Sequence, residues 1–122
     1  MTVLWVEVAM SESRVGTEME TNAEMAALRQ SIDAIDDGLV KLLAERQRHI
    51  AMAAEIKGRI GWPPRIDSRV EEVIARVQAA ALRENLSPEL ATSLWSILVE
   101  WSIGYEEELM GAAPQEVDPS AE

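Results

Sequence analysis

The stretch LRQSIDAIDDGLVKLLAERQRHIAMAAEIK, residues 28–57, decides the fold class of this chain. No proline occurs between about Asn22 and Lys57, and Gly38 costs a helix only about 1 kcal/mol. Apolar residues recur there with the spacing of one helical face, which is typical of an amphipathic helix. They are Leu28, Ile32, Ile35, Leu39, Leu42, Ile50 and Ala53. The sequence therefore predicts one helix over about residues 22–57.

A helix of this length is too long for a compact domain of 122 residues. At about 1.5 Å per residue, roughly 35 residues span about 50 Å. A monomer would leave much of the apolar stripe exposed, which soluble proteins avoid. We therefore expect an intertwined homodimer in which the long helices of two chains pair.

A loop and a second helix are expected next. GRIGWPPRID, residues 58–67, contains two glycines and a Pro-Pro pair, which helix interiors exclude. Ser68 and Glu71 have the spacing of a capping box. They predict a helix over about residues 69–84, which Asn85 would end.

The third helix is expected to begin with Ser87 as N-cap and Pro88 as first residue, and to run to about Met110. Its predicted inward residues are Leu90, Leu94, Ile97, Leu98, Trp101 and Tyr105. No segment alternates with the period of a strand. The predicted fold is all-α, with three helices per chain, one of them very long.

The predicted domain occupies residues 24–110. Residues 1–23 read as a flexible leader without the basic start of a signal peptide. Residues 111–122 read as a disordered acidic tail because they are rich in small residues, proline and acids.

The composition excludes several classes of function. A net charge of −11 argues against nucleic acid as a partner. The chain has no cysteine and a single histidine, His49, which argues against a metal centre with thiolate or histidine ligands. No stretch is apolar enough for a membrane span. A cytoplasmic protein that does not bind membranes is the expectation.

Two cations lie within the apolar stripe of the long helix. Arg46 and Lys57 are eleven residues apart, about three turns, so they project in nearly the same direction as Ile50. Arg29 lies on the same broad face. Each cation could extend its head into water. Three together, in an acidic protein, are costly unless anions neutralise them. Internal carboxylates could do so, and a small anionic ligand is at least as good an explanation.

The stretch 28–57, the loop ending in RIDSR and the segment SPELATSLWSILVEWSIGYEEEL resemble the all-helical chorismate mutases, the AroQ family. The LRxxIDxIDxxLxxLLxxR pattern is specific, and the resemblance covers about residues 24–110. It implies an intertwined dimer that rearranges chorismate to prephenate. This reaction requires neither a metal nor a redox cofactor, because the protein holds a dianion in a folded shape and stabilises developing charge.

The resemblance also assigns roles to residues. It implies that Arg46 and Arg69 hold carboxylates of the dianionic substrate, and that Arg29 reaches in from the other chain. Lys57 would donate to the ether oxygen and to a nearby carboxylate. Ser102 would help to seat the ring carboxylate.

Glu106 occupies a place where many members of the family have glutamine. It lies four residues after Ser102, on the same helical face. An ionised Glu106 would repel the developing oxyanion, whereas a protonated one would donate to it. Glu106 could instead be a solvated residue of the acidic run 106–108.

The start of the second helix departs from the family pattern. Val70 stands where the family usually has a glutamate that accepts from the C4 hydroxyl of the substrate. Glu71 is about 100° further round the helix and is a poor substitute. The acid expected in the loop is also shifted, with Ile66 in its place and Asp67 next.

These departures keep other functions open. An Arg-Val pair at this point also resembles the isochorismate pyruvate lyases, which form salicylate. A 4-amino-4-deoxychorismate mutase is a third possibility. A helical dimer without catalysis, regulating another enzyme of the shikimate pathway, is a fourth.

Overall fold

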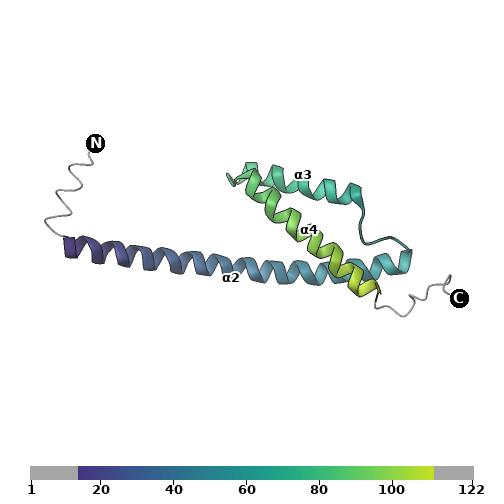
Figure 1. Cartoon of the computed structure of the whole chain (residues 1–122), viewed down its shortest axis with the longest axis horizontal. Helices are drawn as coiled ribbons and strands as arrows, with labels where there is room; N and C mark the ends of the chain where they lie inside the picture. Colours follow the sequence, from purple (N-terminus) through teal and green to yellow (C-terminus); the bar gives the residue numbers. More distant parts are fainter. Residues whose placement is uncertain (1–13, 112–122) are drawn as a thin grey trace. The chain divides into compact units, whose positions relative to one another are not determined.

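A computed structural model of the chain describes residues 14–111. Three helices make up this part, which contains no strand: α2 is Arg14–Ile60, α3 is Asp67–Arg83 and α4 is Pro88–Gly111 (Figure 1). The predicted all-α class with three helices is confirmed. Over these 98 residues, none of the helices combines the length and the apolar character that crossing a membrane requires.

Helix α2 is longer than the sequence pattern predicts. It has 47 residues and begins at Arg14 rather than at about Asn22, so residues 14–23, expected in the leader, are helical. It ends where Gly61 adopts a φ of 81°, which glycine tolerates best. The amides of Gly61 and Trp62 both donate to the carbonyl oxygen of Lys57, at 2.8 and 2.9 Å. The rest of the predicted leader and residues 112–122 lie outside the described residues.

The chain divides into two compact units, one ending at Leu43 and one beginning at Ala44. In the described part of the first unit, the side chains of residues 18–43 are all exposed in the single chain. The large apolar ones are Met19, Met25, Leu28, Ile32, Ile35, Leu39, Val40, Leu42 and Leu43. This face matches the apolar stripe that the sequence predicts.

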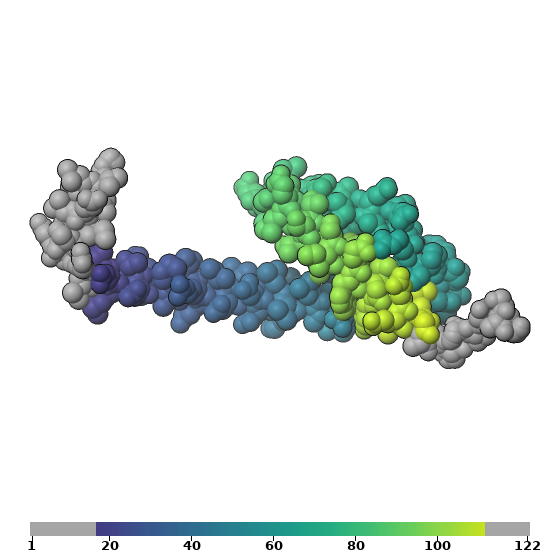
Figure 2. Space-filling model, viewed as in Figure 1, coloured from purple at the N-terminus to yellow at the C-terminus, as the bar shows by residue number. Residues whose placement is uncertain are grey.

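Helices α3 and α4 pack against each other in the second unit (Figure 2). Ala81 and Ala91 are both buried, and such small side chains allow two helix backbones to approach closely. A hydrogen bond of 2.9 Å from Gln78 Nε2 to Thr92 Oγ1 also joins the two helices.

The turn between α3 and α4 follows the predicted signals. Asn85 has a φ of 58°, and the amide of Leu86 donates to the carbonyl oxygen of Ala81 at 2.8 Å, as in a Schellman motif. Ser87 Oγ then accepts from the amide of Leu90 at 3.2 Å, and Pro88 is the first residue of α4. The predicted N-cap at Ser87 is confirmed.

The predicted capping box at Ser68 is wrong. Helix α3 begins at Asp67, and the extended residue Ile66 is its N-cap, without a side-chain cap. The carbonyl oxygen of Ile66 accepts from the amides of Arg69 and Val70, at 3.0 and 3.1 Å. Ser68 is therefore already inside the first turn, where its hydroxyl cannot cap.

The predicted inward face of α4 is also wrong for the single chain. Leu90, Leu94, Ile97 and Trp101 are exposed, and the ring of Trp101 stacks on Tyr105 at 5.0 Å. The buried residues of α4 are Ala91, Val99, Ser102, Ile103 and Glu106. Helix α4 therefore buries a partly polar face, because α2 presents cations to it.

Candidate active site

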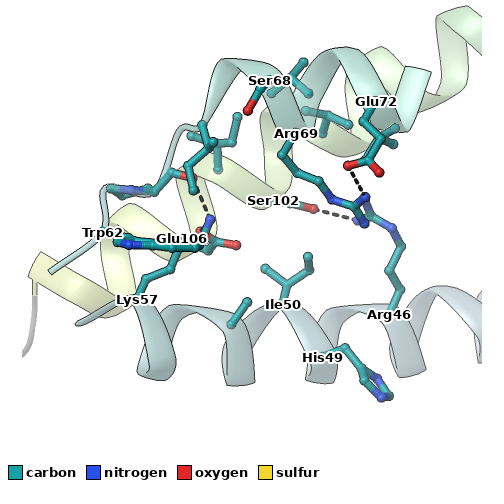
Figure 3. A pocket seen from close by; sticks show the side chains of 17 residues that line it. Arg46, His49, Ile50, Lys57, Trp62, Ser68, Arg69, Glu72, Ser102 and Glu106 are labelled. Carbon is teal, nitrogen blue, oxygen red and sulfur yellow. Dashed lines mark hydrogen bonds and ion pairs between the residues drawn. The ribbon is translucent and has the colours of Figure 1, made fainter. Parts of the chain in front are cut away.

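A cavity of about 790 Å³ lies within the second unit, between the C-terminal part of α2, the loop 61–66, α3 and α4 (Figure 3). Its lining combines charged residues with an apolar wall. The lining residues are Arg46, His49, Ile50, Ala53, Lys57, Trp62, Pro64, Ile66, Ser68, Arg69, Val70, Glu72, Val73, Val99, Ser102, Ile103 and Glu106.

The stripe of α2 that carries the two cations forms one wall. Arg46, Ile50, Ala53 and Lys57 all line the cavity, as the helical spacing predicts. The alternative, that both cations extend into water, is wrong for Lys57, because only 17% of its side chain is exposed. His49 borders the same cavity, but its ring points away from the other labelled side chains (Figure 3).

Arg46 is fixed by α4. Its Nη1 donates to Ser102 Oγ at 2.6 Å, and the Ser102 hydroxyl donates in turn to the carbonyl oxygen of Leu98 at 2.7 Å. Burial lowers the pKa of the Arg46 guanidinium, and the positive charge of Arg69 lowers it further. Two guanidinium groups that repel each other in a partly buried cavity favour the binding of an anion.

Arg69 is paired with a carboxylate one helical turn away. Its Nη1 donates to Glu72 Oε1 at 3.0 Å, and both side chains are about 60% exposed. A salt bridge this exposed is weak, so a ligand carboxylate can displace Glu72.

Lys57 and Glu106 form the most buried ion pair of the described residues. Lys57 Nζ donates to Glu106 Oε1 at 2.7 Å and to the carbonyl oxygen of Pro64 at 2.8 Å. Only 5% of the Glu106 side chain is exposed. The interpretation of Glu106 as a solvated residue of the acidic run is therefore wrong.

The start of α3 presents Val70 to the cavity, where Ile66 from the loop also lies. Neither Asp67 nor Glu71 is a lining residue, so apolar side chains occupy the two places where the family pattern has acids. Glu72 is the acid of α3 that lines the cavity. The sequence interpretation missed Glu72, although its i,i+3 spacing from Arg69 is a usable signal.

Arg29 is not among the lining residues and belongs to the first unit. The role expected for it, in the site of the other chain, stays a prediction.

Over residues 14–111, no three His, Asp or Glu residues are grouped so that they could hold a metal ion. The ion pairs that line the cavity each join one cation to one carboxylate: Lys57 to Glu106, and Arg69 to Glu72.

The fold and the site together define an all-helical protein with a cavity that three cations, Arg46, Lys57 and Arg69, line. The family model for chorismate mutase type II matches residues 28–107, and the chain belongs to this family of isomerases. The resemblance to the AroQ enzymes is thereby confirmed.

Individual relatives agree with the family. A chorismate mutase of Methanocaldococcus jannaschii is 30% identical over 77 residues, which are 63% of this chain and 78% of the relative. A T-protein of Enterobacter agglomerans is 35% identical over 68 residues, 56% of this chain but 18% of the relative. A bifunctional chorismate mutase/prephenate dehydratase of Buchnera aphidicola is 27% identical over 92 residues, 75% of this chain and 24% of the relative.

Proposed function

We propose that this protein catalyses the rearrangement of chorismate to prephenate in the cavity between α2, α3 and α4. The observation that carries the proposal is the meeting of Arg46, Lys57 and Arg69 in one cavity. The substrate is a dianion, and guanidinium groups bind carboxylates through both oxygens. Arg46 and Arg69 are suited to hold its carboxylates, and Ser102, already bonded to Arg46, adds a hydroxyl beside them.

In this proposal Lys57 acts on the breaking bond. An ammonium group has three N–H donors, and two of those on Lys57 are engaged by Pro64 and Glu106. The third has no partner among residues 14–111 and can bind a ligand. Because the C–O bond stretches in the transition state, the ether oxygen gains negative charge, and a donor held there beforehand stabilises that charge.

Glu106 contributes according to its protonation. As a carboxylate it holds Lys57 in place but repels an oxyanion, and as a carboxylic acid it can donate a second hydrogen bond to the ether oxygen. We therefore assign the reacting end of the cavity to Lys57 and Glu106 together.

We further propose that the active unit is a homodimer. The exposed apolar stripe of residues 18–43 supports this, because a second copy of the long helix has a matching stripe to cover it. In that dimer Arg29 of one chain would complete the site of the other.

Val70 favours isochorismate pyruvate lyase as the second candidate, since it puts an apolar wall where the family usually has an acceptor for the C4 hydroxyl. One experiment separates the functions. The protein is incubated separately with chorismate, isochorismate and 4-amino-4-deoxychorismate, and the products are identified.

The proposal is supported if chorismate is converted faster than the other two compounds and prephenate is the product. Salicylate and pyruvate formed from isochorismate would replace the proposed function with the lyase. Preferential turnover of the amino compound would indicate the aminodeoxy mutase. The absence of turnover with all three would favour a regulatory dimer.

A further inference from the structure

The loop 61–66 contributes a wall of the cavity without belonging to any helix. Trp62, Pro64 and Ile66 all line the cavity. The loop has to be held in place, because its movement would displace a hydrogen-bond partner of Lys57.

Two adjacent residues of the loop are tied to different helices. The carbonyl oxygen of Pro64 accepts the bond from Lys57 Nζ, on α2, at 2.8 Å. The guanidinium of Arg65 donates to both carboxylate oxygens of Glu100, on α4, at 3.1 and 2.6 Å. The bond to Pro64 faces the cavity, whereas the pair between Arg65 and Glu100 lies on the exposed surface.

The pair between Arg65 and Glu100 differs from an ordinary surface salt bridge. It is bidentate, which is the geometry in which an exposed pair is most effective. It also joins residues 35 apart in the chain. Its hydrogen bond lowers the pKa of Glu100 and raises that of Arg65, so both groups are charged at neutral pH.

We propose that Arg65 and Glu100 form a clamp that positions Lys57, by holding the Pro64 carbonyl oxygen against the ammonium group from outside the cavity. Neither residue touches the cavity, so both are positioning residues. The catalytic part of this inference rests on the proposed function, because Lys57 is the group that the clamp aligns for the ether oxygen.

The sequence offers a direct test that does not depend on activity. Lys41 and Lys57 are the two lysines of the chain, and Lys41 is exposed. The full-length protein is treated with a limiting amount of acetic anhydride, and the acetylation of the two lysines is compared in peptides by mass spectrometry. Lys41 serves as the internal reference.

Arg65→Ala and Glu100→Gln should each raise acetylation of Lys57 relative to Lys41 by about two- to fivefold. The double variant should show no further increase, because both changes break one interaction. The exchanged pair, Arg65→Glu with Glu100→Arg, should restore the ratio towards that of the unaltered protein. Arg83→Ala, which removes an exposed arginine from the last turn of α3, is the matched control and should leave the ratio unchanged.

Kinetics supply the second measurement. With chorismate, Arg65→Ala should lower kcat by about two- to fivefold and change KM little, because the bond from Lys57 strengthens only in the transition state. An unchanged acetylation ratio in Arg65→Ala, or an equal change in Arg83→Ala, would overturn the clamp. If the unaltered protein does not convert chorismate, the proposed function fails, and the acetylation ratios alone decide the clamp.

Discussion

Nζ of Lys57 lies 2.7 Å from Oε1 of Glu106, and 17% and 5% of the two side chains are exposed. This pair joins the end of α2 to α4, and Glu106 is the residue of α4 whose carboxylate lines the cavity. A buried pair is costly to break, because the partner left behind is an uncompensated charge. The free energy of unfolding should therefore fall when either residue is changed alone.

Lys57→Ala should lower kcat/KM for chorismate by about 10²- to 10³-fold, because it removes the donor that we propose for the ether oxygen. It should also destabilise the fold by about 3–5 kcal/mol, because it leaves Glu106 buried without a partner. Lys57→Ala combined with Glu106→Gln should regain stability in a urea titration without regaining activity. Recovery of activity in the double variant would remove Lys57 from the mechanism.

Glu106→Gln should raise kcat on chorismate at neutral pH. The carboxylate paired with Lys57 repels an oxyanion, whereas the neutral amide of glutamine, which has nearly the same shape, donates to it. The measurement is kcat of the two proteins on chorismate under the same conditions. An unchanged kcat would show that Glu106 takes no part.

Arg29→Ala and Arg46→Ala should each abolish turnover, yet a mixture of the two variants should recover part of it. In a dimer with shared sites, a mixed dimer has one site that lacks both arginines and one that keeps both. Activity is measured after denaturation and joint refolding, with subunit exchange verified by mass. No recovery despite exchange would place both arginines in one chain's site.

Glu72→Gln should lower KM for chorismate by about twofold, because Glu72 competes with the substrate carboxylate for Arg69 and an exposed pair of this spacing is weak. Glu71→Gln is the matched control, since Glu71 is the neighbouring acid but does not line the cavity. Similar KM changes in the two variants would indicate a general effect of charge on α3.

Glu100 should make the fold sensitive to acid. Its hydrogen bond with Arg65 holds the pKa of Glu100 below the ordinary value, so the stabilisation is complete above that value and is lost as pH falls through the lowered pKa. The melting temperature of the unaltered protein should exceed that of Glu100→Gln at pH 7. The difference should vanish in strong acid. A difference in melting temperature that persists in strong acid would show that the pair between Arg65 and Glu100 is not its cause.

The helices of this protein and one wall of its site were predictable from the sequence. The spacing of Arg46, Ile50 and Lys57 predicts a shared face because side-chain direction within a helix depends only on position along it. The cap at Ser87 is equally local, whereas α2 continues past its predicted end at Lys57 and ends at Ile60. The start of α3 was misjudged, because the backbone conformation of Ile66 decides it rather than the hydroxyl of Ser68.

Other features depend on which segments fold against one another. The sequence by itself determined three helices and a cationic stripe, since these follow from local periodicity. Only the tertiary structure decided that Glu106 is buried against Lys57, that Glu72 rather than Glu71 faces the cavity, and that Pro64 and Arg65 tie the loop to two helices. The pair Arg65–Glu100 joins residues 35 apart and the pair Lys57–Glu106 joins residues 49 apart. No local preference brings such residues together, because their meeting depends on how helices of particular lengths pack.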